Sequence, residues 1–254
     1  MKNLLILFFS LALTLSLVAC DGSQGANGDI KVDIDFTILD DPYNTILGFY
    51  QNPEDFAGKS IAIKAGSSVI YNFSKNTVDK KIMLGLDPTG CCNAYYEIRS
   101  NDGIYPDISP ETTFTGNFTE NGYIELTSFS SSSATAPEYE IDALSMSAEE
   151  LKTFILEYGS NYQESESFEK TIRVFGHLLN QGDYKYLFGL NENGVQTWGI
   201  ELYEPTGELN FPIVSGNFVN PVEIIGKLSV YFENGIAYAC ITVERVSKVE
   251  CVFS

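Results

Sequence analysis

Two adjacent cysteines, Cys91 and Cys92, are the residues of this chain whose type and spacing point most directly to chemistry. Neighbouring side chains of an extended strand point to opposite faces, so the two thiols would not readily chelate one metal together. The alternation of residues 93–98 puts Cys92 in phase with apolar positions and Cys91 with polar ones. We therefore expect Cys92 to pack inside and Cys91 to be an exposed thiol. A strained vicinal disulfide with a redox role is the alternative.

Other catalytic patterns in the chain are incomplete. His177 is the only histidine, and we expect it to be exposed or half-buried, because no Gly-x-Ser-x-Gly or His-Glu-x-x-His motif accompanies it. Gly58-Lys59-Ser60 lacks the leading glycine of a phosphate-binding loop, since Pro53 stands there. Paired carboxylates could support glycoside hydrolysis, but among 34 acidic residues a pair at any spacing occurs by chance, so they do not indicate it. No zinc-type spacing is present. We predict no metal, no cofactor, and binding in preference to catalysis.

Cys20 ends a segment typical of bacterial lipoprotein signal peptides. Residues 1–20 contain the basic Lys2, an apolar stretch, and the lipobox Leu17-Val18-Ala19-Cys20. The apolar run is short for the roughly 20 residues of a membrane-spanning helix. We predict that Cys20 carries a lipid that anchors the chain on the extracytoplasmic side of a membrane in the cell envelope. The small polar residues 21–28 form the expected flexible tether.

The net charge limits the classes of partner that the chain can bind, and the cysteine content bears on the redox state of its compartment. The net charge is −19, and removal of the leader with Lys2 makes it one unit more negative. Because nucleic acids are bound through clustered lysine and arginine, we exclude them as partners. Four cysteines remain after Cys20, and they allow three disulfide pairings in an oxidising compartment. They are Cys91, Cys92, Cys240 and Cys251.

The mature chain contains an internal repeat. Residues 29–38 alternate as a half-buried strand, and Asp41-Pro42 predicts a helix that runs to about Tyr50, before several short strands. After Ser/Ala/Pro-rich residues 130–137 the series restarts, with Ser147 and Glu150 as a capping box. Glu120-Asn121-Gly122, expected to form a tight primed turn, returns as Glu233-Asn234-Gly235.

The closest correspondence lies in the middle of each repeat. Gly85-Leu86-Asp87 and Glu97 match Gly189-Leu190-Asn191 and Glu201 at a constant offset of 104 residues. We infer a duplication, with domains at 29–129 and 138–254 joined by linker 130–137. The expected fold is mainly β with short helices, as two tandem OB-like small β-barrels. A β-sandwich is the alternative.

The first repeat also resembles an uncharacterised family of bacterial envelope domains. Its residues that match the family pattern are Ile34-Asp35-Phe36-Thr37, Asn52-Pro53-Glu54-Asp55-Phe56-Ala57-Gly58-Lys59 and Asp87-Pro88-Thr89-Gly90-Cys91-Cys92. The resemblance covers roughly residues 30 to 128 and implies an OB-like barrel without an activity. In the second repeat, Val195 and Gln196 replace the cysteine pair.

Aromatic residues make up 13% of the chain, and exposed rings on a small barrel suit sugars or peptides. Tyr95, Tyr105 and Tyr203 are the candidate ligand-binding residues. We therefore predict a lipid-anchored envelope protein that binds or scaffolds a glycan, peptide or protein. The alternative is a thiol redox or metal-handling lipoprotein that acts through Cys91 and Cys92.

Overall fold

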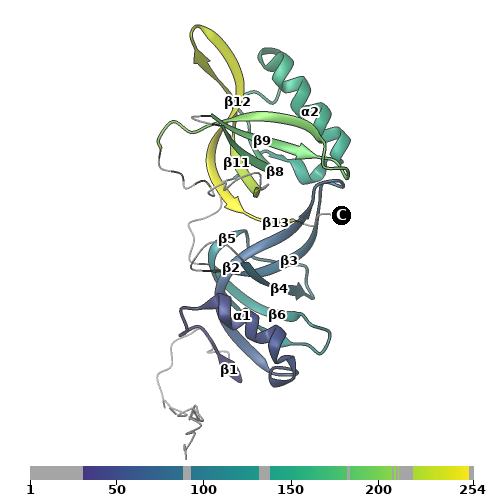
Figure 1. The fold of residues 1–254 in the computed structure, drawn as a ribbon, viewed down its shortest axis with the longest axis vertical. Coiled ribbons are helices and arrows are strands. Elements are labelled where there is room, and N and C mark those ends of the chain that lie inside the picture. The colour runs from purple at the N-terminus through teal and green to yellow at the C-terminus, as the bar shows by residue number, and fades with distance from the viewer. Residues whose placement is uncertain are drawn as a thin grey trace, which may run out of the picture. The chain divides into compact units, whose positions relative to one another are not determined.

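The computed structural model describes residues 31–87, 93–131, 138–181, 184–207, 209, 211 and 220–251. All of the described helices and strands belong to one compact unit, residues 32–254. They form two small β-barrels, each preceded by a two-residue strand and a helix (Figure 1).

The first barrel is a ring of five strands in the order β2-β3-β4-β6-β5, which closes where β2 pairs with β5. The short strand β1 adds to β2 in parallel. The elements are β1 (Ile34–Asp35), α1 (Pro42–Gln51), the 3-10 turn η1 (Pro53–Asp55), β2 (Ser60–Asn72), β3 (Thr77–Leu86), β4 (Asn93–Ser100), β5 (Ser109–Phe118) and β6 (Ile124–Ser131).

The second barrel repeats this arrangement in the order β8-β9-β10-β12-β11, closed by β8 with β11 and extended by β7. Its elements are β7 (Ile141–Asp142), η2 (Ala143–Ser145), α2 (Ala148–Asn161), η3 (Tyr162–Glu164), β8 (Thr171–Gln181), β9 (Tyr184–Leu190), β10 (Gln196–Tyr203), β11 (Asn220–Glu233) and β12 (Ile236–Lys248).

The two rings have the same topology. In each, the first strand pairs antiparallel with the second and the fourth, and the third runs parallel to the fifth. This is the strand order of an OB barrel, and closure of the rings excludes an open two-sheet sandwich. The expected fold class is confirmed, and the shared order is what a duplication produces.

A bulge with a glycine lies at the same point of both rings. Gly116 faces Ile61 across β2 and β5, and Gly226 faces Ile172 across β8 and β11, each directly after a shift in register. A Cβ at Gly116 would lie 2.5 Å from the Glu125 carbonyl oxygen, and one at Gly226 would lie 2.4 Å from that of Thr242. Only glycine lets the two strands approach this closely where the barrel bends.

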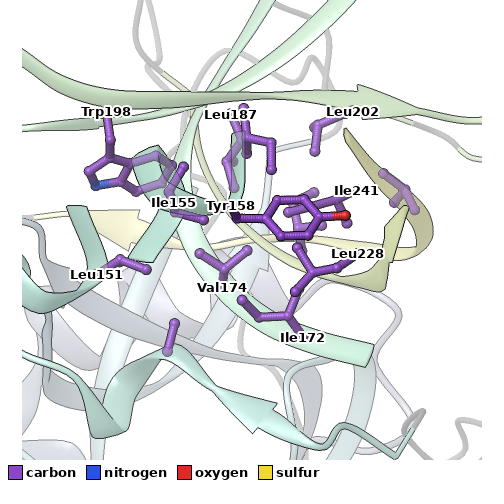
Figure 2. Close-up of a cluster of buried hydrophobic side chains, with 14 of the residues drawn as sticks. Leu151, Ile155, Tyr158, Ile172, Val174, Leu187, Trp198, Leu202, Leu228 and Ile241 are labelled. Carbon is purple, nitrogen blue, oxygen red and sulfur yellow. The ribbon is translucent and has the colours of Figure 1, made fainter. Parts of the chain in front are cut away.

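Each helix closes one barrel on its own apolar core. Asp41 accepts a hydrogen bond from the Asn44 amide at 3.0 Å and Pro42 begins α1, whereas the predicted capping box of Ser147 and Glu150 begins α2. From α2, Tyr158 points into the second barrel among aliphatic side chains of its strands (Figure 2). Its hydroxyl donates to the Ser229 carbonyl oxygen at 3.0 Å.

The chain also departs from the expected boundaries. Of the strand expected at residues 29–38, the structure describes residues 31–38, and within these only Ile34–Asp35 forms a regular strand. β6 continues through Ser131, inside the stretch expected as a linker. A last strand, β13 (Glu250–Cys251), leaves the second barrel and pairs in parallel with β2 at Ile70 and Tyr71.

The two Asn-Gly turns differ. Asn234 and Gly235 both have positive φ, as a primed hairpin turn requires. At the first position only Gly122 has positive φ, and the Thr119 and Tyr123 backbones pair around a longer loop, so the expected primed turn is wrong there.

Candidate functional site

Four tyrosines and two glutamates lie together on the outer surface of the second barrel, and we name this set the tyrosine face. It comprises Tyr184 of β9, Glu201 and Tyr203 of β10, Tyr231 and Glu233 of β11, and Tyr238 of β12. The strand period of two explains their position, because Ile200 and Leu202, which alternate with Glu201 and Tyr203 along β10, are buried in the core.

Three of the tyrosine rings form a stack. The Tyr203 and Tyr231 centroids are 5.4 Å apart with planes 8° apart, and those of Tyr231 and Tyr238 are 5.3 Å apart with planes 19° apart. Tyr203 and Tyr238 remain 40% and 37% exposed. Aromatic rings in this state supply a large flat contact area that a ligand can cover.

The two glutamates accept hydrogen bonds from tyrosines of the same face. The Tyr231 hydroxyl donates to Glu201 Oε1 at 2.7 Å, and the Tyr184 hydroxyl donates to Glu233 Oε1 at 2.8 Å. Removal from water raises the pKa of Tyr231, and the hydrogen bond to Glu233 raises the pKa of Tyr184. Both hydroxyls are therefore protonated donors at neutral pH, and they hold the carboxylates in place.

Polar side chains of β11 and β12 lie beside these glutamates and tyrosines, on the same side of the sheet. Cys240, directly opposite both Glu201 and Ser229, is fully buried. Its Sγ lies 3.3 Å from the Ser229 hydroxyl, which also lies 2.7 Å from that of Thr242. Burial raises the pKa of the Cys240 thiol, so we expect this cysteine to be unreactive in the folded chain.

The location of the tyrosine face matches the region that OB barrels use for ligands. In such barrels the second and third strands, with the loops between strands one and two and between strands four and five, bind oligonucleotides or oligosaccharides. Here those strands are β9 and β10, and the last connection is the turn between β11 and β12. This fold-level analogy adds weight to the site but does not identify its ligand.

The structure separates the three candidate tyrosines. Tyr203 lies in the tyrosine face, whereas Tyr95 and Tyr105 belong to the first barrel. Tyr95 is 40% exposed, and its carbonyl oxygen accepts from the Tyr50 hydroxyl at 2.5 Å. Tyr105 is half-buried, with its hydroxyl accepting from the Ser100 amide at 3.0 Å and Lys81 Nζ 5.7 Å from its ring centroid.

Of the cysteines discussed from the sequence, the structure describes only Cys240 and Cys251. Cys20, Cys91 and Cys92 lie outside the described residues, and Cys251 is half-buried in β13. Burial raises the pKa of the Cys251 thiol to about 11. Among the residues that the structure describes, no group of three or more histidine, cysteine or acidic side chains is arranged to hold a metal ion.

His177 is fully buried, so the expectation of an exposed or half-buried histidine is wrong. Its ring centroid lies 3.9 Å from that of Phe73 in the first barrel, and its Nδ1 has no hydrogen-bond partner. Burial lowers the pKa of His177 to about 4, so the imidazole is neutral at pH 7. It packs as an aromatic side chain between the barrels.

Comparison of the chain with protein-family models and with curated proteins gave no match. The assignment of the tyrosine face as a candidate binding site therefore depends on its geometry alone. Of its six residues, sequence reasoning selected only Tyr203. Tyr231 and Tyr238 follow the hairpin pattern around Asn234-Gly235, and that pattern could have placed them opposite each other.

Proposed function

We propose that the protein is a non-enzymatic binding protein of the bacterial cell envelope, anchored through a lipid on Cys20. Its partner, a glycan, peptide or envelope protein, binds to the tyrosine face of the second barrel. The observation that supports this most is the stack of Tyr203, Tyr231 and Tyr238, because two of its rings are more than one-third exposed although each packs against Tyr231. Rigid aromatic rings lose little conformational entropy when a ligand covers them.

The anchor part of the proposal rests on residues 1–20, which the structure does not describe. Among the helices that it does describe, none is long and apolar enough to cross a membrane. The tether of residues 21–28 would leave the barrels free to meet a polymer or a protein near the membrane.

The test compares two variants of the full chain, kept in a neutral detergent, for binding to purified cell-wall sacculi, a glycan array and an array of envelope-protein peptides. Tyr203→Ala with Tyr238→Ala removes the outer rings of the stack. Tyr95→Ala is the matched control, because it removes an equally exposed tyrosine from the first barrel. Loss of binding in the double variant alone supports the proposal, and equal binding by all three proteins contradicts it.

A further inference from the structure

The first barrel contains a glutamate, at the position equivalent to Glu201, that is neutralised by its own cations. Glu97 lies 2.7 Å from Lys80 Nζ and 2.6 Å from Arg99 Nε. The Arg99 guanidinium carbon is also 4.1 Å from the ring centroid of Tyr123. A cation is thus held between a carboxylate and a tyrosine ring on the outer surface of this barrel.

The sheet registers give the equivalent residues of the second barrel. Glu97 faces Ile82 across β3 and β4, and Glu201 faces Tyr186 across β9 and β10, with 104 residues between the equivalents on both strands. The same offset makes Tyr184 the equivalent of Lys80 and Tyr203 the equivalent of Arg99. The second barrel therefore keeps the glutamate and has tyrosines in place of both cations.

This exchange leaves the tyrosine face without a cation of its own. Among the ion pairs of the described residues, none includes Glu201 or Glu233, and the hydrogen bonds that these carboxylates accept come from neutral tyrosines. A guanidinium or ammonium group is attracted both by such a carboxylate and by the face of an aromatic ring. The net charge of −19 also attracts a cation from a distance.

We infer that the tyrosine face binds a basic peptide segment, whose arginine or lysine pairs with Glu201 as Arg99 pairs with Glu97 in the first barrel. The inference rests on the proposed function, because it assigns the partner of the same face. The ligand cation would lie beside Glu201 and against the ring of Tyr203, which is an outer ring of the stack and 40% exposed. It would supply from outside the charge that the first barrel supplies from within.

The experiment titrates the full chain in neutral detergent with the capped peptide Gly-Arg-Gly-Arg-Gly and follows binding by calorimetry. The control peptide has citrulline, which has the same shape without the charge, in place of both arginines. We expect the citrulline peptide to bind at least about tenfold more weakly, and Glu201→Gln to weaken the arginine peptide by a similar factor. Glu97→Gln, at the equivalent position of the first barrel, should leave the affinity unchanged.

Exchange of residues between the barrels gives a second, independent test. Tyr184→Lys with Tyr203→Arg rebuilds the internal cations around Glu201, and it should abolish peptide binding while the thermal unfolding stays cooperative. The reverse exchange, Lys80→Tyr with Arg99→Tyr, should create a second site around Glu97 and raise the stoichiometry from one to two. A variant that unfolds is replaced by the single Tyr203→Arg change, which alone supplies the guanidinium.

The outcomes separate this inference from the proposed function. Equal affinity for the arginine and citrulline peptides, or no effect of Glu201→Gln, overturns the cationic ligand. If a neutral glycan binds in a manner that depends on Tyr203 and the arginine peptide does not bind, the proposed function stands and this inference fails. If arginine amide alone binds as tightly as the peptide, the peptide partner is overturned. If neither peptides nor glycans bind the wild-type chain, both proposals fail.

Discussion

The ring of Tyr71 in β2 stacks on the ring of Phe175 in β8, with centroids 4.6 Å apart and planes 14° apart. Val69 and Val249 are buried against the same pair. The first barrel thus contributes its long β2–β3 hairpin, and the second contributes β8 and Val249, which lies between β12 and β13. Because these contacts are apolar and fully buried, we expect the two barrels to unfold together as one cooperative unit.

The first prediction concerns the contribution of Asn76, at the tip of this hairpin, to the stability of the chain. Its Nδ2 donates to the carbonyl oxygens of Ala143 and Met146, each at 2.6 Å, and its Oδ1 accepts from the Tyr71 hydroxyl. Asn76→Ala should lower the free energy of unfolding by about 3 kcal/mol, because it leaves buried polar groups without partners. Urea unfolding measures the loss.

Asn234→Ala is the matched control for this change. Both asparagines have positive φ, 57° at Asn76 and 51° at Asn234, but Asn234 is exposed in the β11–β12 turn. The control therefore loses only the tolerance of asparagine for positive φ, which should lower the free energy of unfolding by about 1 kcal/mol. Equal losses in the two variants would show that the contacts of Asn76 between the barrels do not contribute to stability.

The local elements were predictable from the sequence, because short-range patterns determine them. Alternation placed Ala94, Tyr96 and Ile98 inside and Tyr95 and Glu97 outside, and the burial of these residues confirms it. The capping box of α2 and the OB-like barrel class followed from similar signals, whereas the order of the strands was not predicted. What the sequence did not reveal depends on contacts between distant segments.

His177, β13 and the tyrosine face illustrate this limit. The burial of His177 is produced by Phe73 from the other barrel, and β13 pairs with a strand about 180 residues earlier in the chain. The tyrosine face could be predicted only in part from the sequence, because its residues lie on four strands whose pairing the sequence does not give. Tyr203 and Tyr231 meet only once the parallel pairing of β10 with β12 is known.

A buried ion network provides the second prediction. Glu223 is 2% exposed and lies 3.1 Å from Arg173 Nε and 3.0 Å from Arg245 Nη2. Glu223→Gln should destabilise the protein by about 3–5 kcal/mol, because the largely buried Arg245 loses its ion-pair partner and Arg173 keeps only Asp142, at 3.8 Å. Glu149→Gln, which breaks the exposed pair with Lys152, should change stability by less than about 1 kcal/mol. Chemical denaturation of both variants at pH 7 compares them.

The third prediction concerns thiol reactivity in the reduced native protein. Cys240 is fully buried and should react with a maleimide only on unfolding, and Cys251, with its raised pKa, should react slowly. From its strand phase, we expect Cys91 to react much faster than Cys92. Mass spectrometry of timed samples gives each rate. Equal, slow labelling of Cys91 and Cys92 would show that the facing assignment is wrong, and labelling of Cys91 only after reduction would favour a disulfide.

The fourth prediction tests the anchor. Cys20→Ser removes the thiol that would accept the lipid, so the variant should either appear in the soluble fraction or remain as an unprocessed precursor. Metabolic labelling with a fatty acid and cell fractionation give the result. Cys251→Ser is the control, because it removes another cysteine and should leave labelling intact. Unchanged lipid labelling of the Cys20 variant would contradict the signal-peptide interpretation.

The last prediction is a loss of stability in mild acid that depends on His177. Burial lowers the pKa of this imidazole to about 4 in the folded chain, whereas an unfolded histidine has a pKa of about 6.5. Between these values the unfolded chain binds a proton that the folded chain does not, so stability falls as the pH is lowered. From pH 7 to pH 5 the histidine alone should lower the free energy of unfolding by about 2 kcal/mol.

His177→Leu isolates this contribution, because it keeps an apolar side chain of similar size beside Phe73 and cannot titrate. Altered packing should destabilise the variant equally at both pH values, so the comparison uses only the change in the free energy of unfolding between pH 7 and pH 5. Wild-type protein should lose about 2 kcal/mol more than the variant over this interval in urea titrations. Parallel losses in the two proteins would mean that the imidazole gains a proton in the folded state, and that its place between the barrels is open to water.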